Sequence, residues 1–283
     1  MAAIFKAGHT AVITGGASGI GLSLAKKCFG HGMKVLVADW DDETLDAVNK
    51  NVGGGSGRDI GTIKVDVSKT DDWAKLKTRV DKDFSGQINL LALNAGIGPS
   101  SSWDDAQSFQ KIMDVNLFGV VNGISTFLNT VKSTATSSPA SIIITGSKQG
   151  ITNPPGNPAY NASKAAVKSI AEHLSYDLRN EKQLSVHLLV PGWTFTGLSG
   201  NRPGAGKQKP DGAWWPDQVV EYLEKKMDDG QFWVLCPDDQ VTEDLDRKRM
   251  LWGASDAIEG RPPLTRWRDE WKGKHQEWVD KQK

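Results

Sequence analysis

The sequence lacks the features of several protein classes. Its 283 residues include only two cysteines, Cys28 and Cys236, which argues against a disulfide framework or a zinc site built on paired cysteines. Basic and acidic residues number 34 each, so there is no positive excess to neutralise a nucleic acid. No apolar run approaches the roughly 18–20 residues that cross a bilayer, and the first residues lack the apolar segment of a secretion signal. We therefore expect a cytoplasmic protein without nucleic-acid or membrane partners.

Histidine is sparse, whereas tryptophan is abundant. The five histidines are scattered and form no ligand cluster, so we expect no metal site. Of the eleven tryptophans, eight lie from Trp193 onward. Apolar residues make up 38% and charged residues 24%, as in a protein with a real core. The length fits one domain of about 200–250 residues with an appendage, or two small domains.

Short β-branched runs alternate with amphipathic stretches through the first two-thirds of the chain. Continuous apolar runs of this kind predict strands that are covered on both faces, at residues 10–14, 34–38, 62–67, 88–93, 141–145, 185–190 and 232–236. The stretches between them predict helices at 19–30, 41–50, 70–83, 105–133, 158–180 and 216–227. This alternation predicts an α/β fold: a single Rossmann-like, doubly wound domain with about seven parallel strands flanked by helices.

The last part of the chain departs from this rhythm. We expect the core over about residues 8–238, a lid-like segment over about 193–228, and a C-terminal helical extension over about 240–283. The lid contains a stretch rich in Gly, Pro and Lys at 201–212, between a strand end and a helix, where mobile lids occur. The extension begins with a predicted amphipathic helix that ends near Glu259.

A glycine-rich turn, Thr-Gly-Gly-Ala-Ser-Gly-Ile-Gly at 14–21, follows the first predicted strand and opens the first helix. Glycine lets the backbone turn tightly and approach a pyrophosphate, and the helix N-terminus supplies N–H groups and partial positive charge. This strand–turn–helix context predicts a dinucleotide site. The contacts expected from this turn are Gly15, Ser18, Gly19, Ile20 and Gly21.

Asp39 ends the second predicted strand, 18 residues after Gly21. A carboxylate there can accept hydrogen bonds from the adenosine ribose hydroxyls and repels a 2′-phosphate. Neither Ser18 nor Trp40, the neighbouring contacts that we expect, supplies a cation for such a phosphate. We predict NAD(H) as the preferred cofactor, with NADP(H) possible. The alternative is that Asp39 only caps the helix that begins near Asp41.

Two further strands carry polar residues at their expected carboxyl ends, where open parallel sheets bind ligands. Asp66 and Val67 close the third strand, and Asn94, Ala95 and Gly96 follow the fourth. We expect all five residues to contact the cofactor. The structural alternatives are that Asp66 caps the next helix and that Asn94 holds a turn or a neighbouring strand.

A hydroxyl, a phenol and an amine follow the fifth predicted strand. Ser147 lies just past it, Tyr160 comes 13 residues later, and Lys164 four residues after that. Residues i and i+4 share one helix face, so the phenol and the ammonium project into the same space. A nearby cation lowers the pKa of a tyrosine, which otherwise titrates near pH ~10. Tyr160 is then a candidate acid/base for a carbonyl or an alcohol, and Ser147 a group that holds the substrate oxygen.

These motifs, in this order and spacing, resemble the short-chain dehydrogenase/reductase family over roughly residues 8–236. The resemblance rests on the glycine turn at 14–21, Asp66, Asn94-Ala95-Gly96, Asn116, Ser147, Tyr160, Lys164 and Pro191-Gly192.

The resemblance implies a role for each catalytic candidate. It implies that Tyr160 is the acid/base and that Ser147 orients the substrate. Lys164 would tune the tyrosine and bind the nicotinamide ribose. Asn116 resembles the helix-breaking asparagine that supports a proton-relay water, and its alternative role is a buried amide at a helix kink.

The resemblance also covers the end of the sixth predicted strand. Pro191 and Gly192 lie where family members bring backbone and a threonine to the nicotinamide carboxamide. Thr196 falls at the position of the family's threonine. Thr194 stands where the family usually has a small aliphatic residue, a change that should leave a backbone contact intact. All four residues are expected cofactor contacts.

Aromatic residues surround the expected lid. Trp193, Trp214 and Trp215 flank the segment that covers the substrate in the family, and their indoles could line an apolar pocket. The alternative is packing or subunit contact. Lys148 and Gln149 follow Ser147 directly and are further candidates for the same cavity. With Ser147 and Tyr160, these residues are the expected substrate contacts.

The sequence thus predicts an NAD(H)-dependent oxidoreductase that interconverts a secondary alcohol and a ketone, preferably bulky and cyclic or aromatic. One alternative is an NADPH-preferring reductase of a carbonyl, imine or quinone. A less favoured alternative is a catalytically silent nucleotide-sensing scaffold, against which the intact Ser147, Tyr160 and Lys164 weigh. The resemblance further implies a homodimer or homotetramer built on the helices at 105–133 and 158–180.

Overall fold

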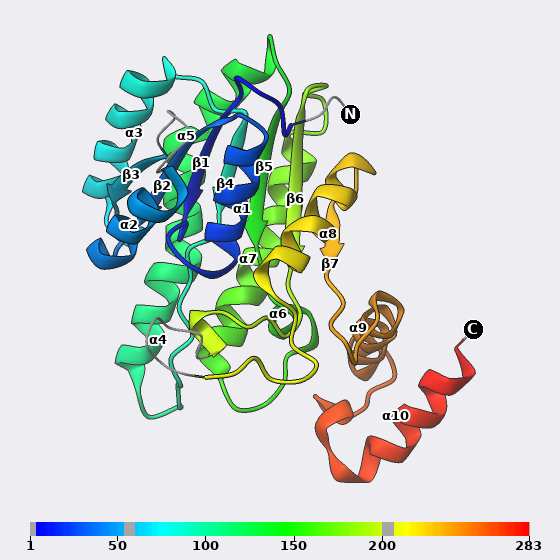
Figure 1. The fold of residues 1–283 in the computed structure, drawn as a ribbon. Coiled ribbons are helices and arrows are strands. Elements are labelled where there is room, and N and C mark those ends of the chain that lie inside the picture. Colours follow the sequence, from blue (N-terminus) through cyan, green and yellow to red (C-terminus); the bar gives the residue numbers. More distant parts are fainter. Residues whose placement is uncertain (1–3, 54–59, 200–206, 283) are drawn as a thin grey trace.

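Seven parallel strands form one sheet in the order β3-β2-β1-β4-β5-β6-β7 (Figure 1). The computed structural model describes residues 4–53, 60–199 and 207–282. The strand order reverses between β1 and β4, which confirms the predicted doubly wound α/β fold. The strands are β1 (Thr10–Thr14), β2 (Lys34–Asp39), β3 (Gly61–Lys64), β4 (Leu90–Leu93), β5 (Ala140–Thr145), β6 (Leu184–Val190) and β7 (Trp233–Leu235).

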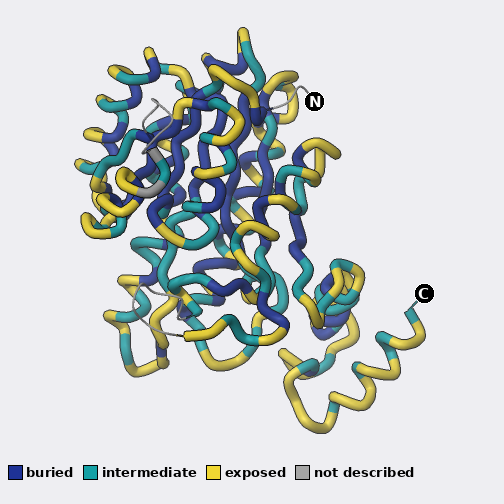
Figure 2. The backbone as a smooth tube through the Cα atoms, viewed as in Figure 1, coloured by how far each residue is buried: buried dark blue, intermediate teal, exposed yellow. Residues whose placement is uncertain are grey.

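Helices cover both faces of the sheet because alternate strand residues point to opposite sides. Val12 packs with Trp73 and Phe127 in one core, whereas Ile13 packs with Leu24 and Leu223 in the other. The first core lies under α3 (Thr70–Phe84), α5 (Gly119–Ala135) and α7 (Pro158–Asp177), and the second under α1 (Gly19–Gly30), α2 (Asp42–Val48) and α8 (Pro216–Asp228). The strands are therefore buried between two helical layers (Figure 2).

The predicted helix at 105–133 is wrong as a single α-helix. It consists of α4 (Ala106–Met113), a π-helical turn η2 (Asp114–Phe118) and α5. A π turn accommodates one residue more than an α turn, so it changes the direction in which side chains on its two sides project. Asn116 lies in this turn with no exposed surface, which agrees with a buried amide at a helix irregularity.

The third strand is shorter than predicted. β3 ends at Lys64, because the backbone N–H of Asp66 donates to the Asp72 carboxylate (3.0 Å) rather than to a neighbouring strand. Asp66 and Val67 therefore lie in the connection to α3, beyond the strand that we expected them to close.

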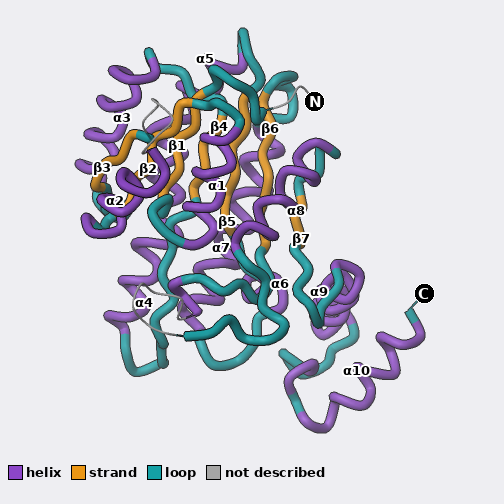
Figure 3. Tube along the Cα trace, viewed as in Figure 1, coloured by secondary structure: helices purple, strands orange, loops and turns teal. Residues whose placement is uncertain are grey.

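Loops and short helices gather at the carboxyl ends of the strands (Figure 3). The helix α6 (Lys148–Thr152), which follows β5, was not predicted. A 3-10 turn, η3 (Gly197–Ser199), lies within the predicted lid, and the part of the lid at 200–206 lies outside the described residues. In the first half of the chain, the π turn η1 (Asn49–Gly53) follows α2.

The C-terminal extension consists of α9 (Glu243–Ile258), the 3-10 turn η4 (Thr265–Trp267) and α10 (Asp269–Lys281). The Thr242 side chain caps α9 by accepting from the Leu245 N–H (3.1 Å), and the helix ends at Ile258, near the predicted Glu259. The predicted apolar face is not found, because Ile258 is exposed whereas Asp246 and Asp256 are buried beside Trp252. The predicted helical extension is confirmed, although no separate bounds were predicted for α10, which projects away from the sheet (Figure 1). No helix of the described chain is long and apolar enough to cross a membrane.

The extension has a small core of its own around Trp252, which is 3% exposed. The indole N–H of Trp252 donates to the Thr265 hydroxyl (2.8 Å). The Arg261 guanidinium lies 4.1 Å from the centre of its ring, and the rings of His275 and Trp278 meet it edge to face at 5.2 and 5.4 Å. These contacts explain why tryptophans recur in a tail that is otherwise polar.

Candidate active site

The glycine turn between β1 and α1 is so tightly folded that only glycine fits at two positions. A Cβ on Gly21 would lie 2.1 Å from the carbonyl oxygen of Gly15, and one on Gly15 would lie 2.8 Å from the Cα of Ala95. Gly15 and Gly19 have positive φ angles of 61° and 51°, which glycine adopts without strain. Ser18 is the N-cap of α1, yet its side chain caps none of the helix N–H groups. These features fit a phosphate-binding turn, in which the helix N–H groups face an anion.

Asp39 joins the end of β2 to the glycine turn. Its carboxylate accepts from the backbone N–H of Ala17 (3.0 Å) and from that of Trp40 (2.8 Å). Burial raises the pKa of Asp39, against the opposing effect of these hydrogen bonds. The alternative role as a helix cap is wrong, because Asp41 caps α2 by accepting from Glu43 and Thr44. Trp40, beside it, is exposed.

Asn94 fastens three neighbouring segments together at the end of β4. Its amide donates to the carbonyl oxygens of Thr14 and Gly15 (both 3.2 Å), and it accepts from the Thr145 hydroxyl (3.1 Å). Asn94 thus holds the glycine turn in place, as the structural alternative predicted. This role is compatible with cofactor contacts from Ala95 and Gly96, which follow it.

Asp66 caps no helix. Its carboxylate accepts from the backbone N–H (3.0 Å) and the hydroxyl (2.7 Å) of Ser68 in a local turn. The N-cap of α3 is instead Lys69. Val67 is buried, and a Cβ on Gly119 would touch its side chain at 2.8 Å. This segment therefore packs directly against the start of α5.

Ser147 and Tyr160 meet beyond the end of β5. Ser147 caps α6 by accepting from the Gln149 N–H (3.1 Å), which fixes the position of its hydroxyl. Burial raises the pKa of Tyr160, and a hydrogen bond with Ser147 opposes that rise. Gln149 itself is exposed.

Lys164 lies one helical turn from Tyr160 on α7, as the i,i+4 spacing requires. Its Nζ donates to the carbonyl oxygen of Thr145 (2.9 Å) and lies 5.9 Å from the centre of the Tyr160 ring. Burial lowers the pKa of Lys164 to about 8. The predicted lowering of the Tyr160 pKa is therefore not found here, because burial dominates at both residues and disfavours the charged form of each.

Asn116 and Lys164 approach the same point from two helices. The Asn116 side chain accepts from the Ile97 N–H (2.8 Å) and donates to the Ile97 carbonyl (3.0 Å) and the Ser163 hydroxyl (3.1 Å). A Cβ on Gly96 would lie 3.3 Å from Asn116 Oδ1 and 3.5 Å from Lys164 Nζ. The π turn thus brings the predicted asparagine beside the predicted lysine.

The segment after β6 is held by backbone hydrogen bonds near its start and extends to the glycine turn. Trp214 donates from its backbone N–H to the Trp193 carbonyl (2.8 Å), and Phe195 donates to the Trp214 carbonyl (2.9 Å). Thr194 is buried and donates to the Gly192 carbonyl (3.1 Å). A Cβ on Gly19 would lie 3.1 Å from the Thr196 side chain. The structure therefore gathers most of the predicted cofactor residues at one edge of the sheet.

The three predicted pocket tryptophans divide into two groups. Trp214 packs edge to face on Tyr222 (5.9 Å) against the core under α8, which agrees with the alternative of a packing role. Trp193 and Trp215 are 47% and 48% exposed. Trp215 stacks edge to face on Phe195 at 5.7 Å.

Lys148 forms two ion pairs instead of facing the expected cavity. Its Nζ lies 3.1 Å from Asp238 and 2.8 Å from Asp246, both in the chain after β7. A charge held by two carboxylates is not available to a substrate in this conformation. The sequence pattern missed this contact because Asp246 is 98 positions away from Lys148 and belongs to the extension.

The sequence analysis missed Gly98, which lies against the Tyr160 ring, and Leu198, which lies against Gly98. A Cβ on Gly98 would meet the Leu198 side chain at 3.4 Å and the Tyr160 ring at 3.5 Å. Leu198 belongs to η3 and is 60% exposed. No local sequence signal identifies Leu198, because its place depends on how the segment after β6 folds back.

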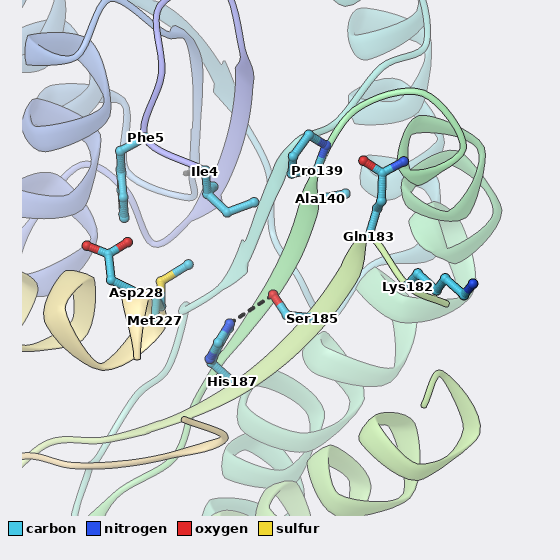
Figure 4. Close-up of a pocket in the computed structure, with 10 residues that line it drawn as sticks. All are labelled: Ile4, Phe5, Pro139, Ala140, Lys182, Gln183, Ser185, His187, Met227 and Asp228. Atoms are coloured by element: carbon cyan, nitrogen blue, oxygen red, sulfur yellow. Dashed lines mark hydrogen bonds between the residues drawn. The ribbon is translucent and has the colours of Figure 1, made fainter. Parts of the chain in front are cut away.

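A separate pocket of about 80 Å³ lies at the opposite, amino-terminal end of the strands (Figure 4). His187 in its wall bonds through Nδ1 to the Gln231 carbonyl (2.7 Å) and through Nε2 to the Ser185 hydroxyl (2.9 Å). Burial lowers the pKa of His187, so the neutral ring fits these two bonds. Both ring nitrogens are thus engaged within the protein, and the pocket is far from Tyr160 along the strands. Among the described residues, no cluster of His, Cys, Asp and Glu could hold a metal ion.

Comparison with known proteins gives a consistent result. The short chain dehydrogenase family model matches residues 9–205. The chain is 31% identical over 201 residues to an NADP-dependent (R)-specific alcohol dehydrogenase of Lentilactobacillus kefiri, covering 70% of this chain and 78% of that protein. It is 32% identical over 209 residues to 3beta-hydroxysteroid dehydrogenase 2 of Eggerthella lenta, covering 72% and 76% of the two chains.

A solved structure extends the likeness to most of the fold. A short chain dehydrogenase/reductase from Burkholderia phymatum, crystallised in complex with NAD, superimposes with a TM-score of 0.79 and 27% sequence identity. The match covers 91% of this chain and 96% of that one.

Proposed function

Because the chain belongs to the short-chain dehydrogenase/reductase family, we propose that it is an NAD(H)-dependent enzyme that interconverts a secondary alcohol and a ketone, with Tyr160 as acid/base. Membership makes the chain an NAD(P)-dependent oxidoreductase of alcohol or carbonyl groups. The preference for NAD(H), the class of substrate and the roles of single residues are our proposals. The single observation that carries the proposed reaction is the meeting of Ser147, Tyr160 and Lys164 at the end of the sheet where the glycine turn lies.

The proposed chemistry assigns one task to each side chain. The nicotinamide supplies or accepts the hydride when it is bound. In reduction, Tyr160 donates its phenolic proton to the carbonyl oxygen, and in oxidation the phenolate takes the proton of the hydroxyl. Ser147, whose hydroxyl already bonds with Tyr160, holds the same substrate oxygen. Asn116 and Lys164, beside Gly96, would carry the proton between Tyr160 and solvent through an ordered water.

The cofactor preference rests on Asp39. The similar proteins differ in their cofactor: one relative is named NADP-dependent, and one similar solved structure contains NAD. Asp39 is fixed by Ala17 and Trp40 at the end of β2, where a carboxylate can bind ribose hydroxyls and repels a 2′-phosphate. We therefore assign NAD(H), held by the glycine turn, Asp39, Asp66 and Val67, Asn94 to Gly96, and Pro191 to Thr196.

The substrate is proposed to be bulky and cyclic or aromatic. Leu198 and Tyr160 both lie against Gly98, and Trp193 and Trp215 offer half-exposed apolar surface in the predicted lid. The hydroxysteroid dehydrogenase among the relatives acts, by its name, on a substrate of this class.

Steady-state assays of cyclic, aryl and aliphatic ketones and alcohols, each with both nicotinamides, test this proposal. Y160F should lower kcat by about 10²–10⁴-fold while NADH still binds. The matched control is Y176F on the same helix, because Tyr176 is 63% exposed and stacks on Arg179. Full turnover by Y160F, or no turnover of any compound by the parent enzyme, would refute the proposal.

Two further expectations concern the whole protein. We propose a homodimer or homotetramer that works in the cytoplasm. Light scattering coupled to size-exclusion chromatography measures the first, and a monomer at micromolar concentration would contradict it.

A further inference from the structure

A buried cluster of charges links the C-terminal extension to the residue that follows Ser147. Lys148 Nζ lies 3.1 Å from Asp238 and 2.8 Å from Asp246. Only 15% of the Lys148 side chain is exposed, and the carboxylates are 10% and 0% exposed. Arg249 adds a more distant contact of 3.7 Å to Asp246. None of these four residues takes part in the proposed chemistry.

Lys148 belongs to α6, the helix that carries Ser147 at its start. Lys148 is the first residue of α6, and Ser147 is the N-cap of that helix. Gly150 brings α6 against α7 so closely that a Cβ would lie 2.6 Å from the carbonyl carbon of Lys164. A shift of α6 would therefore move Ser147 relative to Tyr160 and Lys164.

Asp238 contacts the segment that follows β6. Its Oδ2 accepts from the backbone N–H of Trp193 (3.3 Å), and a Cβ on Gly192 would lie 2.9 Å from the same oxygen and 3.0 Å from Lys148 Nζ. The backbone N–H of Lys148 also donates to the Pro191 carbonyl (3.4 Å). One carboxylate thus holds the segment proposed to face the nicotinamide and the segment that carries Ser147.

The extension reaches α6 at both ends. Asp246 of α9 meets Lys148 at the first residue, and the Trp267 indole N–H of η4 donates to the carbonyl of Thr152 at the last residue (3.4 Å). Burial of such charges is costly unless they are paired, so each member of the cluster depends on the others.

We propose that Lys148, Asp238 and Asp246 are positioning residues through which the extension sets the distance between Ser147 and the 191–193 segment. The effect on catalysis rests on the proposed function, whereas the effect on backbone order does not. A displacement of about 1 Å at a reacting centre can cost roughly 10²-fold in rate, so a modest loosening has a large effect.

The experiment compares D246N with D244N in the full-length protein. Asp244 lies on the same helix, pairs with Lys248 and is 71% exposed, so its substitution controls for charge and helix. Hydrogen exchange is measured over residues 146–153 and 191–196, and kcat and KM are measured with the best substrate and NADH. K148M and K148R form a second pair, in which only K148R keeps the charge.

In D246N we expect exchange over both segments to rise about tenfold and kcat to fall about tenfold, with a smaller rise in KM for NADH, because the glycine turn and Asp39 still hold the cofactor. D244N should match the parent, and K148R should recover most of the kcat that K148M loses. If D246N does not accumulate as folded protein, D238N replaces it, because Lys148 then keeps Asp246 as a partner.

Exchange that rises only within residues 240–282, with kcat within twofold of the parent, would overturn the inference. A parent enzyme without turnover would instead overturn the proposed function, and the exchange data would still decide whether the cluster orders both segments.

Discussion

Asp39 Oδ2 accepts a hydrogen bond of 3.0 Å from the backbone N–H of Ala17, and this bond ties the end of β2 to the glycine turn. The carboxylate therefore has two possible functions, one in shaping the turn and one in excluding a 2′-phosphate. Asparagine at this position keeps an acceptor oxygen but removes the charge, whereas alanine removes both. The two substitutions separate the functions.

We expect D39N to improve kcat/KM with NADPH by at least about tenfold, because removal of a charge repulsion of this kind is worth about 1–2 kcal/mol. D39A should in addition weaken binding of both nicotinamides, since Ala17 loses its acceptor. Steady-state kinetics with NADH and NADPH measure both effects. A parent enzyme that already prefers NADPH, or a D39N enzyme with unchanged preference, would show that Asp39 does not select the cofactor.

Gly21 offers a test of the turn itself. In G21A the new Cβ would lie 2.1 Å from the Gly15 carbonyl oxygen and 2.7 Å from Asn94 Nδ2, so the turn must move. We expect the free energy of unfolding to fall by about 1–3 kcal/mol and NADH affinity to be lost. G253A is the control, because a Cβ there meets no described atom within 4 Å and helix propensity favours alanine by about 1 kcal/mol. Equal NADH titrations for the two variants would contradict the expected role of the turn.

Lys164 should make stability depend on pH. Its pKa falls from 10.5 to about 8 on folding, so between these values the unfolded chain binds more protons and stability rises with pH. Below pH 8 both states are charged and the burial penalty is complete, at about 3 kcal/mol. K164M should therefore be more stable than the parent at pH 7, and the gain should shrink to about 1 kcal/mol or less at pH 10.

Urea unfolding at the two pH values measures this difference. K168M is the matched control on the same helix, since Lys168 forms a partly exposed pair with Glu172 worth no more than about 0.5 kcal/mol. A K164M protein that is less stable than the parent at pH 7 would show that the bond from Lys164 to Thr145 outweighs the cost of burying the charge.

Arg261 should control the packing of the extension. Its guanidinium covers the Trp252 ring and lies 3.0 Å from Asp256, with both charged side chains less than 10% exposed. R261A leaves a buried carboxylate unpaired, which costs about 3–5 kcal/mol locally. We expect a red shift of tryptophan emission and faster proteolysis near residues 259–268. R268A, at a side chain 44% exposed, should change neither, and an unshifted emission spectrum for R261A would contradict the role of Arg261.

Local patterns predicted the sheet and the catalytic spacing well. Continuous apolar runs identified seven strands, and the bounds of β1 and α1 agree with the predicted ranges. The spacing of Tyr160 and Lys164 predicted their shared helix face because that relationship depends only on helical periodicity. Turn chemistry likewise predicted the glycine turn, whose steric demands are local.

Features that depend on tertiary contacts were missed or misassigned. Lys148 looked like a pocket residue because its partners, Asp238 and Asp246, come from a distant segment. Tryptophan is a residue type that often lines pockets, but Trp214 packs on Tyr222. The helix α10 carries Trp271, His275 and Trp278 at helical spacing, but their partner, Trp252, lies in α9 and could not be identified from the local pattern.

The π turn η2 (Asp114–Phe118) sets the orientation of α4 relative to α5. If the same residues formed a regular α-helix, each would advance by the full angle of about 100°, and α4 would be rotated by roughly one residue step relative to α5. Asn116 would then leave its bonds to Ile97, and α4 would present a different side to α7. The extra residue of this turn therefore sets which side of α4 faces α7 and brings Asn116 to Ile97.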